Sequence, residues 1–457
     1  MELLKLRKKH EIDMTSGRLL PSLLRFAVPV ILSGILQLAF NAADLIVVGR
    51  FAGDNALAAV GSNSALVSLI VNVMMGICTG TSVITARYFG SKDNDGLSAT
   101  VHTSILIAFF GGFFLAIVGV LAAEPMLQLM GTPEEILPLS AVYLRIYFAG
   151  MPVMMLYNFS SAILRSVGDS KRPLYFLAMA GVINIGLNLF FVIVLKTSVA
   201  GVAIATVTSQ LVSCFLTLRA LVKAEGAPYR LVFKKLRFSG FVLKQILRIG
   251  IPAGIQNSLF LISNVIIQSS INSFGALVVA GNSAATSIEA FVFVSLDAVN
   301  QASIASVSQN FGAKAPSRVR RAVRYCLIIE LVIGGIMGWS TYLLGETLLG
   351  IYTKDPMAIS TGLLRFAILG TTFFLNGLQH MMGGVMRSIG YSILPMCVSL
   401  FGICGIRLIW IFAVYPANSV IEMLYISYPV SWLITFTIHL ICYLALRKRA
   451  FRTEAAA

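Results

Sequence analysis

The chain contains the stretch Arg165-Ser-Val-Gly-Asp-Ser-Lys-Arg-Pro173, and a second stretch, Arg387-Ser-Ile-Gly-Tyr-Ser-Ile-Leu-Pro395, matches it at five positions. The two stretches lie 222 residues apart (387 − 165). The same offset, within a few residues, links further pairs: Arg25…Pro29 with Arg248…Pro252, Asn41 with Asn264, Phe89-Gly90 with Phe311-Gly312, and Arg145…Gly150 with Arg365…Gly370. The chain therefore consists of two homologous halves, and repeats of this kind in a very apolar chain are typical of transporters.

The composition is that of a polytopic membrane protein. Apolar residues make up 57% of the chain and charged residues 12%, and the mean hydropathy is +0.86. Runs near or above the ~20 residues that span a bilayer predict an all-α fold with twelve transmembrane helices. Their approximate cores are Leu23–Val48, Leu57–Val83, Ser104–Ala123, Leu137–Leu164, Leu174–Leu195, Val199–Val222, Val242–Phe274, Val279–Val307, Ala322–Leu344, Ile359–Met386, Met396–Val414 and Val420–Leu446.

The net charge of +16 is explained by topology rather than by a nucleic-acid partner. Alternate connections and the two termini hold 29 of the 35 basic residues, whereas the intervening connections hold only Arg50, Lys196 and Lys354. By the positive-inside rule, the basic set lies in the cytoplasm. We therefore expect a multi-pass protein of the inner (cell) membrane with both termini cytoplasmic and the lipid bilayer as its partner.

The repeat also predicts the domain organisation. Residues 1–223 form an N-lobe with helices 1–6, residues 224–240 form a basic cytoplasmic linker, and residues 241–457 form a C-lobe with helices 7–12. Six helices per half make the repeats parallel, related by an axis along the membrane normal.

No metal or organic cofactor is expected. The six cysteines have no CxxC spacing, and His102, His380 and His439 show no ligand spacing. These residues are interpreted as packed or interfacial side chains.

Polar residues at membrane depth carry the functional information, because each needs a partner or a water-filled cavity. In the first helix one stripe is polar, formed by Ser33, Gln37, Asn41 and Asp44. A carboxylate at mid-helix costs about 2.5–3.5 kcal/mol. The alternative is an interfacial Asp44 near the outer end, since Arg50 follows within two turns.

The fifth helix offers Asn184 and Asn188, one turn apart, and the sixth offers Thr206. Such groups also serve as ordinary interhelical hydrogen-bonding partners. Convergence with Asp44 would make them an oxygen-rich site.

In the second half, the seventh helix carries Asn257, Asn264, Gln268 and Asn272 on one face, and the eighth carries Asn282, Glu289, Asp297 and Asn300. Arg407 lies near the middle of the eleventh helix, and Glu289 or Asp297 is its predicted partner. A structural ion pair and a role in substrate or ion binding both remain open. Glu330 follows Arg324 closely and is interpreted as a residue that reaches the inner interface.

These residues resemble the multidrug and toxic compound extrusion (MATE) family over nearly the whole chain. The resemblance is carried by Phe26-Ala-Val-Pro29-Val…Asn41-Ala-Ala-Asp44-Leu, Gly80-Thr81…Gly90, Arg165-Ser-Val-Gly-Asp169 and Gly201-Val-Ala-Ile-Ala-Thr206…Ser209-Gln210. It is strongest to a bacterial branch with Gln256 and Asn257 in the seventh helix and Arg407 in the eleventh. The resemblance implies two six-helix lobes that exchange H⁺ or Na⁺ for organic, often cationic, compounds by alternating access.

The resemblance also implies roles for individual residues. Asp44 matches the first-helix aspartate of the family, and Pro29 matches the proline at which that helix bends. Asn184 and Thr206 match positions of the N-lobe cation site, and Tyr143 lies near its fourth-helix tyrosine.

Two positions depart from the family pattern. Asn188 stands where many members have a second aspartate, which removes one negative charge, weakens the case for Na⁺ and favours protonation of Asp44. The seventh-helix glutamate of the NorM-like branch is missing, and Phe260 lies near that position.

The predicted function is a cation-coupled antiporter, H⁺ being favoured, that exports a small cationic amphipathic compound as a monomer. The cation-coupling residues are Asp44, Asn184, Asn188, Thr206 and Tyr143, with Pro29 as hinge, and the candidate substrate cavity includes Gln37, Asn41, Gln256, Asn257, Asn264, Glu289, Asp297 and Arg407. Alternatives are a Na⁺-coupled exporter, a flippase for lipid-linked oligosaccharides, which would need a more basic cavity, and a membrane enzyme, for which no catalytic cluster stands out.

Overall fold

The computed structural model of the chain describes residues 11–456, and within them the regular elements are helices without any β-strand. In this part of the chain eleven helices are long and apolar enough to cross a membrane, and the bent pair α5 and α6 supplies a twelfth span. The predicted all-α fold with twelve spans is confirmed.

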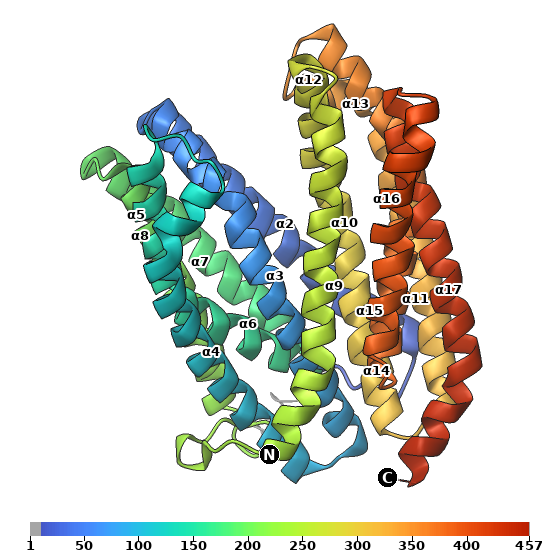
Figure 1. Cartoon of the computed structure of the whole chain (residues 1–457). Coiled ribbons are helices and arrows are strands. Elements are labelled where there is room, and N and C mark those ends of the chain that lie inside the picture. The colour runs from blue at the N-terminus through green and yellow to red at the C-terminus, as the bar shows by residue number, and fades with distance from the viewer. Residues whose placement is uncertain (1–10, 457) are drawn as a thin grey trace. The chain divides into compact units, whose positions relative to one another are not determined.

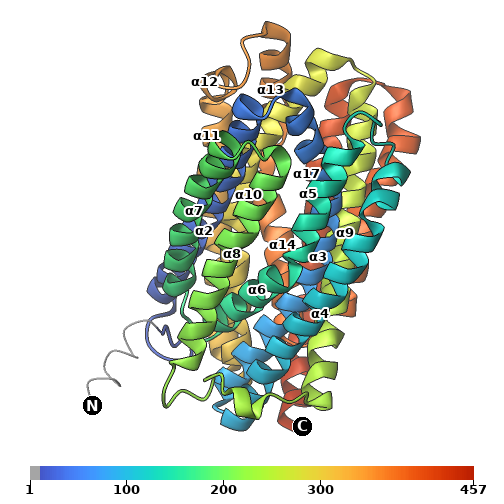
Figure 2. The same ribbon diagram turned by 90° about the vertical axis from the view of Figure 1, so that its left-hand side faces the viewer.

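The first half of the chain (blue to green in Figure 1) provides six spans. They are α2 (Leu19–Phe51), α3 (Asp54–Ser91), α4 (Asn94–Leu129), α5 (Leu137–Ala149) with α6 (Met151–Ser166), α7 (Lys171–Leu189) with a π-helical turn η1 (Phe190–Val194), and α8 (Ser198–Val222). Helices α7 and α8 pack side by side (Figures 1 and 2).

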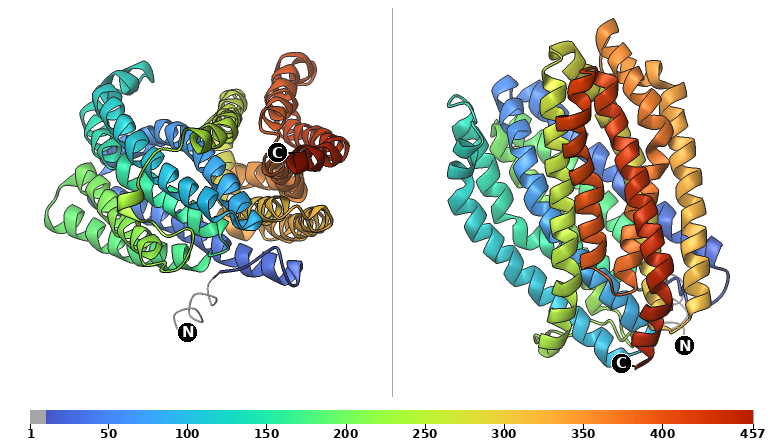
Figure 3. Two further views of the ribbon diagram at one scale, coloured as in Figure 1. Left: turned by 90° about the horizontal axis from the view of Figure 1, so that it is seen from below. Right: turned by 45° about the vertical axis from the view of Figure 1, so that its right-hand side comes forward.

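The second half repeats this order. Its helices are α9 (Gly240–Asn272), α10 (Ala276–Gly312), α11 (Pro316–Leu343), the short α12 (Gly345–Gly350), α13 (Pro356–Ile368) with α14 (Phe373–Ser388), the segments α15 (Ile393–Ser399) and α16 (Ile406–Ile409), and α17 (Ile421–Ala456). Two π-helical turns, η4 (Leu400–Gly405) and η5 (Trp410–Val414), flank α16 within the eleventh span. This span lies beside α17 (Figure 3, right).

Both halves interrupt their fourth span at the same repeat position. Helices α5 and α6 meet at Gly150 with a bend of 47°. Pro152 follows two residues later, and its missing N–H would break an uninterrupted helix. In the second half a 3₁₀ turn at Gly370–Thr372 separates α13 from α14. The shared break supports the internal repeat inferred from the sequence.

The chain divides into two compact units. Unit 1 consists of residues 35–250 with the segment that ends at Ile12, and unit 2 consists of residues 13–34 and 251–457. Helix α2 therefore changes unit after Gly34, five residues beyond Pro29, and α9 changes unit after Gly250. The predicted lobes differ from these units at residues 13–34 and 224–250.

The predicted linker is part of the core of unit 1. Tyr229 and Leu231 are 1% exposed and pack with Leu97 of α4 and Ile163 of α6. The Tyr229 hydroxyl donates a hydrogen bond to Glu11, and burial together with this carboxylate raises the pKa of Tyr229. The basic segment after α8 is thus fixed to the helices it follows.

Small residues allow the start of α9 to approach α3 within unit 1. A Cβ at Gly250 would come within 2.6 Å of the Ile77 Cα atom. By contrast, a Cβ at Gly186 of α7 would have no atom within 4 Å. Contact between these two helix backbones therefore depends on Gly250.

Gly250→Ala should destabilise the protein by about 1–3 kcal/mol, because the added methyl group forces α3 and α9 apart. Gly186→Ala is the matched control and should be neutral or stabilising, since alanine is the better helix former. Thermal unfolding in detergent tests the pair. Equal midpoints for the two variants would refute the close approach.

Candidate functional site

A ring of four polar side chains lies inside unit 1. Asp44 of α2 accepts hydrogen bonds from the Asn188 amide of α7 and from the Thr206 hydroxyl of α8, the latter over 3.4 Å. The Asn188 amide also donates to the Asn184 carbonyl oxygen over 3.2 Å, and the Asn184 amide lies 3.5 Å from the Thr206 hydroxyl. The structure thus brings together four of the five residues predicted for cation coupling.

Helix geometry explains why this ring forms. Asn184 and Asn188 are four residues apart and therefore lie on one face of α7, where they are 5% and 0% exposed. That face is covered by α8, which supplies Thr206. Buried amides next to an apolar core need hydrogen-bonding partners, and Asp44 supplies two acceptor oxygens.

Tyr143, the fifth predicted residue, lies on α5 near the four polar side chains around Asp44. It packs against the apolar cluster that contains Val47 and Val48 of α2, and its ring stacks with Tyr147 at 6.3 Å between centroids. Tyr143 also interacts electrostatically with Asp44. Tyr143 thus lies close to the Asp44 site, and its role in cation coupling stays a prediction.

The donors that hold Asp44 are neutral. Among the described residues, no ion pair involves Asp44, and its hydrogen bonds come from an amide and a hydroxyl. The carbonyl oxygen of Asn188 is buried and has no hydrogen-bond partner within the described part of the chain. Asn188 can therefore donate to an ionised Asp44, or accept from a protonated one after its amide turns over.

The other polar residues of α2 lie on the same helix as Asp44. The Gln37 amide donates to Asn41 over 3.3 Å, and both residues are partly or fully exposed. Pro29 lies inside the helix, which continues past it to Phe51, and its carbonyl oxygen accepts a hydrogen bond from Ser33 over 2.8 Å.

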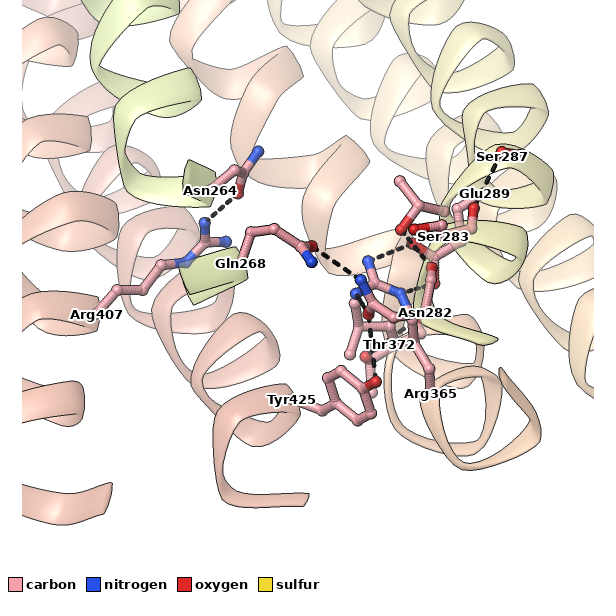
Figure 4. Close-up of polar contacts among 12 residues, drawn as sticks. Asn264, Gln268, Asn282, Ser283, Ser287, Glu289, Arg365, Thr372, Arg407 and Tyr425 are labelled. Atoms are coloured by element: carbon pink, nitrogen blue, oxygen red, sulfur yellow. Dashed lines mark hydrogen bonds and ion pairs between the residues drawn. The ribbon is translucent and has the colours of Figure 1, made fainter. Parts of the chain in front are cut away.

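In unit 2, Glu289 of α10 pairs with Arg365 of α13. Two guanidinium nitrogens lie 3.0 and 2.7 Å from the two carboxylate oxygens (Figure 4). The third guanidinium nitrogen of Arg365 donates to the side-chain oxygen of Asn282 over 2.8 Å. The same oxygen also accepts a hydrogen bond from the Tyr425 hydroxyl over 3.2 Å. Asn282 in turn donates to Gln268 over 2.9 Å, so the buried pair is fully embedded in a polar network.

Arg407 has other partners, and the predicted ion pair with Glu289 or Asp297 is wrong. Its guanidinium donates to Asn264 over 2.9 Å (Figure 4). It also donates to Ser431 over 3.1 Å. It also lies over the Tyr428 ring at 4.1 Å. Arg365 already bonds both carboxylate oxygens of Glu289. The groups that contact Arg407 are therefore an amide, a hydroxyl and an aromatic ring.

Phe260 also borders Arg407, at 5.5 Å from the guanidinium carbon to the ring centroid. This is the residue near the position where the NorM-like branch carries a glutamate. An aromatic ring thus lies beside the buried Arg407, and a cation–π contact contributes to holding its guanidinium.

Asp297 forms a separate group. Its carboxylate accepts from Asn300 over 3.3 Å and from Gln301 over 2.7 Å, and it lies 3.7 Å from the His380 ring nitrogen. The side chain remains 33% exposed. Of the three acids Glu289, Asp297 and Glu330, Asp297 is therefore the one that stays accessible.

Gln256 connects helices. It donates to Ser399 over 2.8 Å and accepts from Arg387 over 2.7 Å, and both Gln256 and Arg387 are buried. The neighbouring Asn257 is half-buried. The candidate cavity residues of unit 2 therefore belong to four separate hydrogen-bonded groups, centred on Gln256, Arg407, Glu289 and Asp297.

Sequence reasoning missed two buried charged residues. Arg365 was recognised only as a repeat marker, although it falls within a predicted span and its counterpart Arg145 pairs with Glu124 at the surface, each side chain being 46% exposed. Glu330 was expected to reach the interface, but it is 0% exposed. Its position midway along a predicted span was the available signal.

Comparison with known proteins gives consistent matches. The MatE family profile matches residues 29–190 and 252–413, one segment in each half. "Probable multidrug resistance protein YoeA" of Bacillus subtilis is 29% identical and the match covers 84% of both chains. The "FAD transporter" of Shewanella oneidensis is 25% identical over 76% of this chain and 77% of the relative. The solved structure of a MATE protein in complex with MaL6 shares the fold, with a TM-score of 0.90 and 20% identity, over 97% of this chain and 99% of that one.

Glu289→Gln or Arg365→Met alone should cost about 3–5 kcal/mol, because each leaves the other buried group unpaired. The double variant should lose less than the sum of the two single losses. Thermal or denaturant unfolding measures this coupling. Arg407→Met combined with Glu289→Gln is the control and should be additive. Two results would contradict the observed pairing. One is additive losses of unfolding free energy for Glu289→Gln and Arg365→Met, and the other is non-additive losses in the control pair.

Proposed function

Because the chain belongs to the MatE family of multidrug efflux transporters, we propose that it exports small organic compounds across the cell membrane in exchange for protons, with Asp44 as the proton carrier. The family consists of multi-span membrane transporters, not enzymes. The coupling ion, the substrate class and the orientation of the termini are our proposals.

One observation carries the proposed coupling: Asp44 is held by neutral donors within a ring of oxygen-bearing side chains. An arginine or lysine partner would fix this carboxylate in its charged form. A second carboxylate at position 188 would create a more strongly charged site suited to a metal cation. With Asn188 instead, the ring suits both the charged and the neutral form of Asp44.

Helix α2 offers a way to couple protonation to conformation. Asp44 lies in the part of α2 that belongs to unit 1, and Pro29 lies in the part that belongs to unit 2. Protonation changes the hydrogen bonds of Asp44, and the missing N–H of Pro29 weakens the helix on the other side of the division. A bend between these residues would bias the equilibrium between inward-open and outward-open states.

We propose a cationic amphipathic substrate because Asp44 and Asp297 are acids that no arginine neutralises among the described ion pairs. Glu289 no longer supports this argument, since Arg365 balances its charge. Gln37, which is partly exposed, and Asn41, which is exposed, lie on the same helix as Asp44 and are the proposed polar contacts of the substrate. Loss of cationic dye export on Asp297→Asn, with folding intact, is the expected result.

An anionic substrate is the second candidate. Arg407 is 1% exposed, and one of its terminal nitrogens has no hydrogen-bond partner within the described residues. The relative named as an FAD transporter makes an anionic flavin nucleotide a reasonable probe. Competition between this nucleotide and a cationic dye in proteoliposomes distinguishes the two substrate classes.

Asp44→Asn should abolish efflux driven by a pH gradient, because asparagine imitates the protonated form with nearly the same shape and cannot exchange a proton. The variant should still insert and fold. Dye efflux from proteoliposomes under separately imposed ΔpH and Na⁺ gradients measures the effect. Wild-type efflux should follow ΔpH and persist without Na⁺. Strict dependence on Na⁺ would instead assign a sodium ion to Asp44, Asn184, Asn188 and Thr206.

Both termini should face the cytoplasm, since the basic connections share one side by the positive-inside rule. Lys235 and Lys354 are exposed residues of connections expected on opposite sides. In intact cells, a membrane-impermeant thiol reagent should label a cysteine at position 354 and spare one at position 235. The reverse labelling pattern would overturn this orientation.

A further inference from the structure

Glu330 is a buried acid that the proposed site leaves unused. It lies near the middle of α11, the span Pro316–Leu343, and is 0% exposed. The residues one turn before and after it are small and buried, namely Cys326 and Gly334. Glu330 therefore points into the interior of unit 2.

Neither carboxyl oxygen of Glu330 has a hydrogen-bond partner within the described part of the chain. On α14, Gly377 leaves room for the group, because a Cβ there would come within 3.1 Å of the Glu330 carboxyl carbon. An ionised carboxylate can only accept hydrogen bonds, and burying one unpaired costs several kcal/mol. A neutral carboxylic acid avoids most of this cost.

No cation pairs with Glu330 among the ion pairs of the described residues. Asp297 of α10 interacts with it electrostatically, and the two charges would have the same sign. The pair Glu289 and Arg365, from α10 and α13, is internally balanced.

Two basic residues of α14, His380 and Arg387, lie near Asp297. His380 lies 3.7 Å from the Asp297 carboxylate, and Arg387 interacts with that carboxylate electrostatically. Asn300 and Gln301 donate hydrogen bonds to it as well. Asp297 thus accepts hydrogen bonds from two amides, and its side chain is 33% exposed, so it is the accessible carboxylate that interacts with Glu330.

We propose that Glu330 is a second proton-binding group of this transporter, protonated in the present conformation and exchanging its proton by way of Asp297. In this step the O–H bond of Glu330 breaks and the proton joins the carboxylate of Asp297, which passes it on to solvent. No other reactant is needed. The inference extends the proposed proton exchange, but proton binding by Glu330 does not depend on the role of Asp44.

Infrared spectroscopy of the purified protein in lipid nanodiscs at neutral pH tests the protonation directly. The wild type should show a carbonyl band of a protonated carboxylic acid that disappears in Glu330→Gln. Glu289→Gln is the matched control and should keep the band, because the Glu289 carboxylate is paired with Arg365. If Glu330→Gln does not fold, Gly377→Ala should shift the same band, since its methyl group contacts the carboxyl group.

Two measurements test whether Glu330 exchanges its proton. The infrared band is followed as the pH is raised, and the number of protons moved per dye molecule is measured in proteoliposomes. The band should vanish in a single step, and Asp297→Asn should change the pH of that step. Glu330→Gln should halve the number of protons per substrate. A spectrum in which Glu330→Gln removes no part of the band, or a Glu330 component insensitive to pH, would overturn the proposal, as would an unchanged proton ratio. If the wild type moves no protons but the band titrates, Glu330 remains a proton-binding group and the proposed function fails separately.

Discussion

A polar group within the hydrocarbon region must find its partner inside the protein, and the interior of this molecule is arranged around that constraint. Unit 1 satisfies it with one acid and three neutral side chains, Asp44 with Asn184, Asn188 and Thr206. Unit 2 satisfies it with a bidentate ion pair between Glu289 and Arg365. The first solution tolerates a change in protonation, whereas the second keeps both charges fixed.

The internal repeat explains the fold better than it explains the chemistry. Both halves break their fourth span at the same place, yet the repeat-related arginines differ in environment. Arg145 pairs with Glu124 at the surface, whereas Arg365 is 5% exposed and holds Glu289. The two halves thus share a scaffold, but one half holds a ring of one acid and three neutral side chains and the other holds a buried ion pair.

The sequence was sufficient to predict the helices, their number and the ring around Asp44, because apolar runs define spans and residues four apart share a helix face. It did not predict which helix covers each face. The partner of Arg407 was therefore assigned incorrectly, and Arg365 was overlooked as the partner of Glu289. For the same reason, Glu330 was expected at the interface although neighbouring helices bury it, and the division of α2 after Gly34 was not foreseen.

The central claim is that Asp44 binds a proton rather than a sodium ion. The most direct measurement is the ¹³C chemical shift of the Asp44 carboxyl group in nanodiscs, assigned by its absence in Asp44→Asn and followed against pH with and without Na⁺. We predict a single titration step that Na⁺ leaves unchanged. A shift of this signal on addition of Na⁺ at constant pH, or no titration at all between acid and alkaline pH, would contradict the claim.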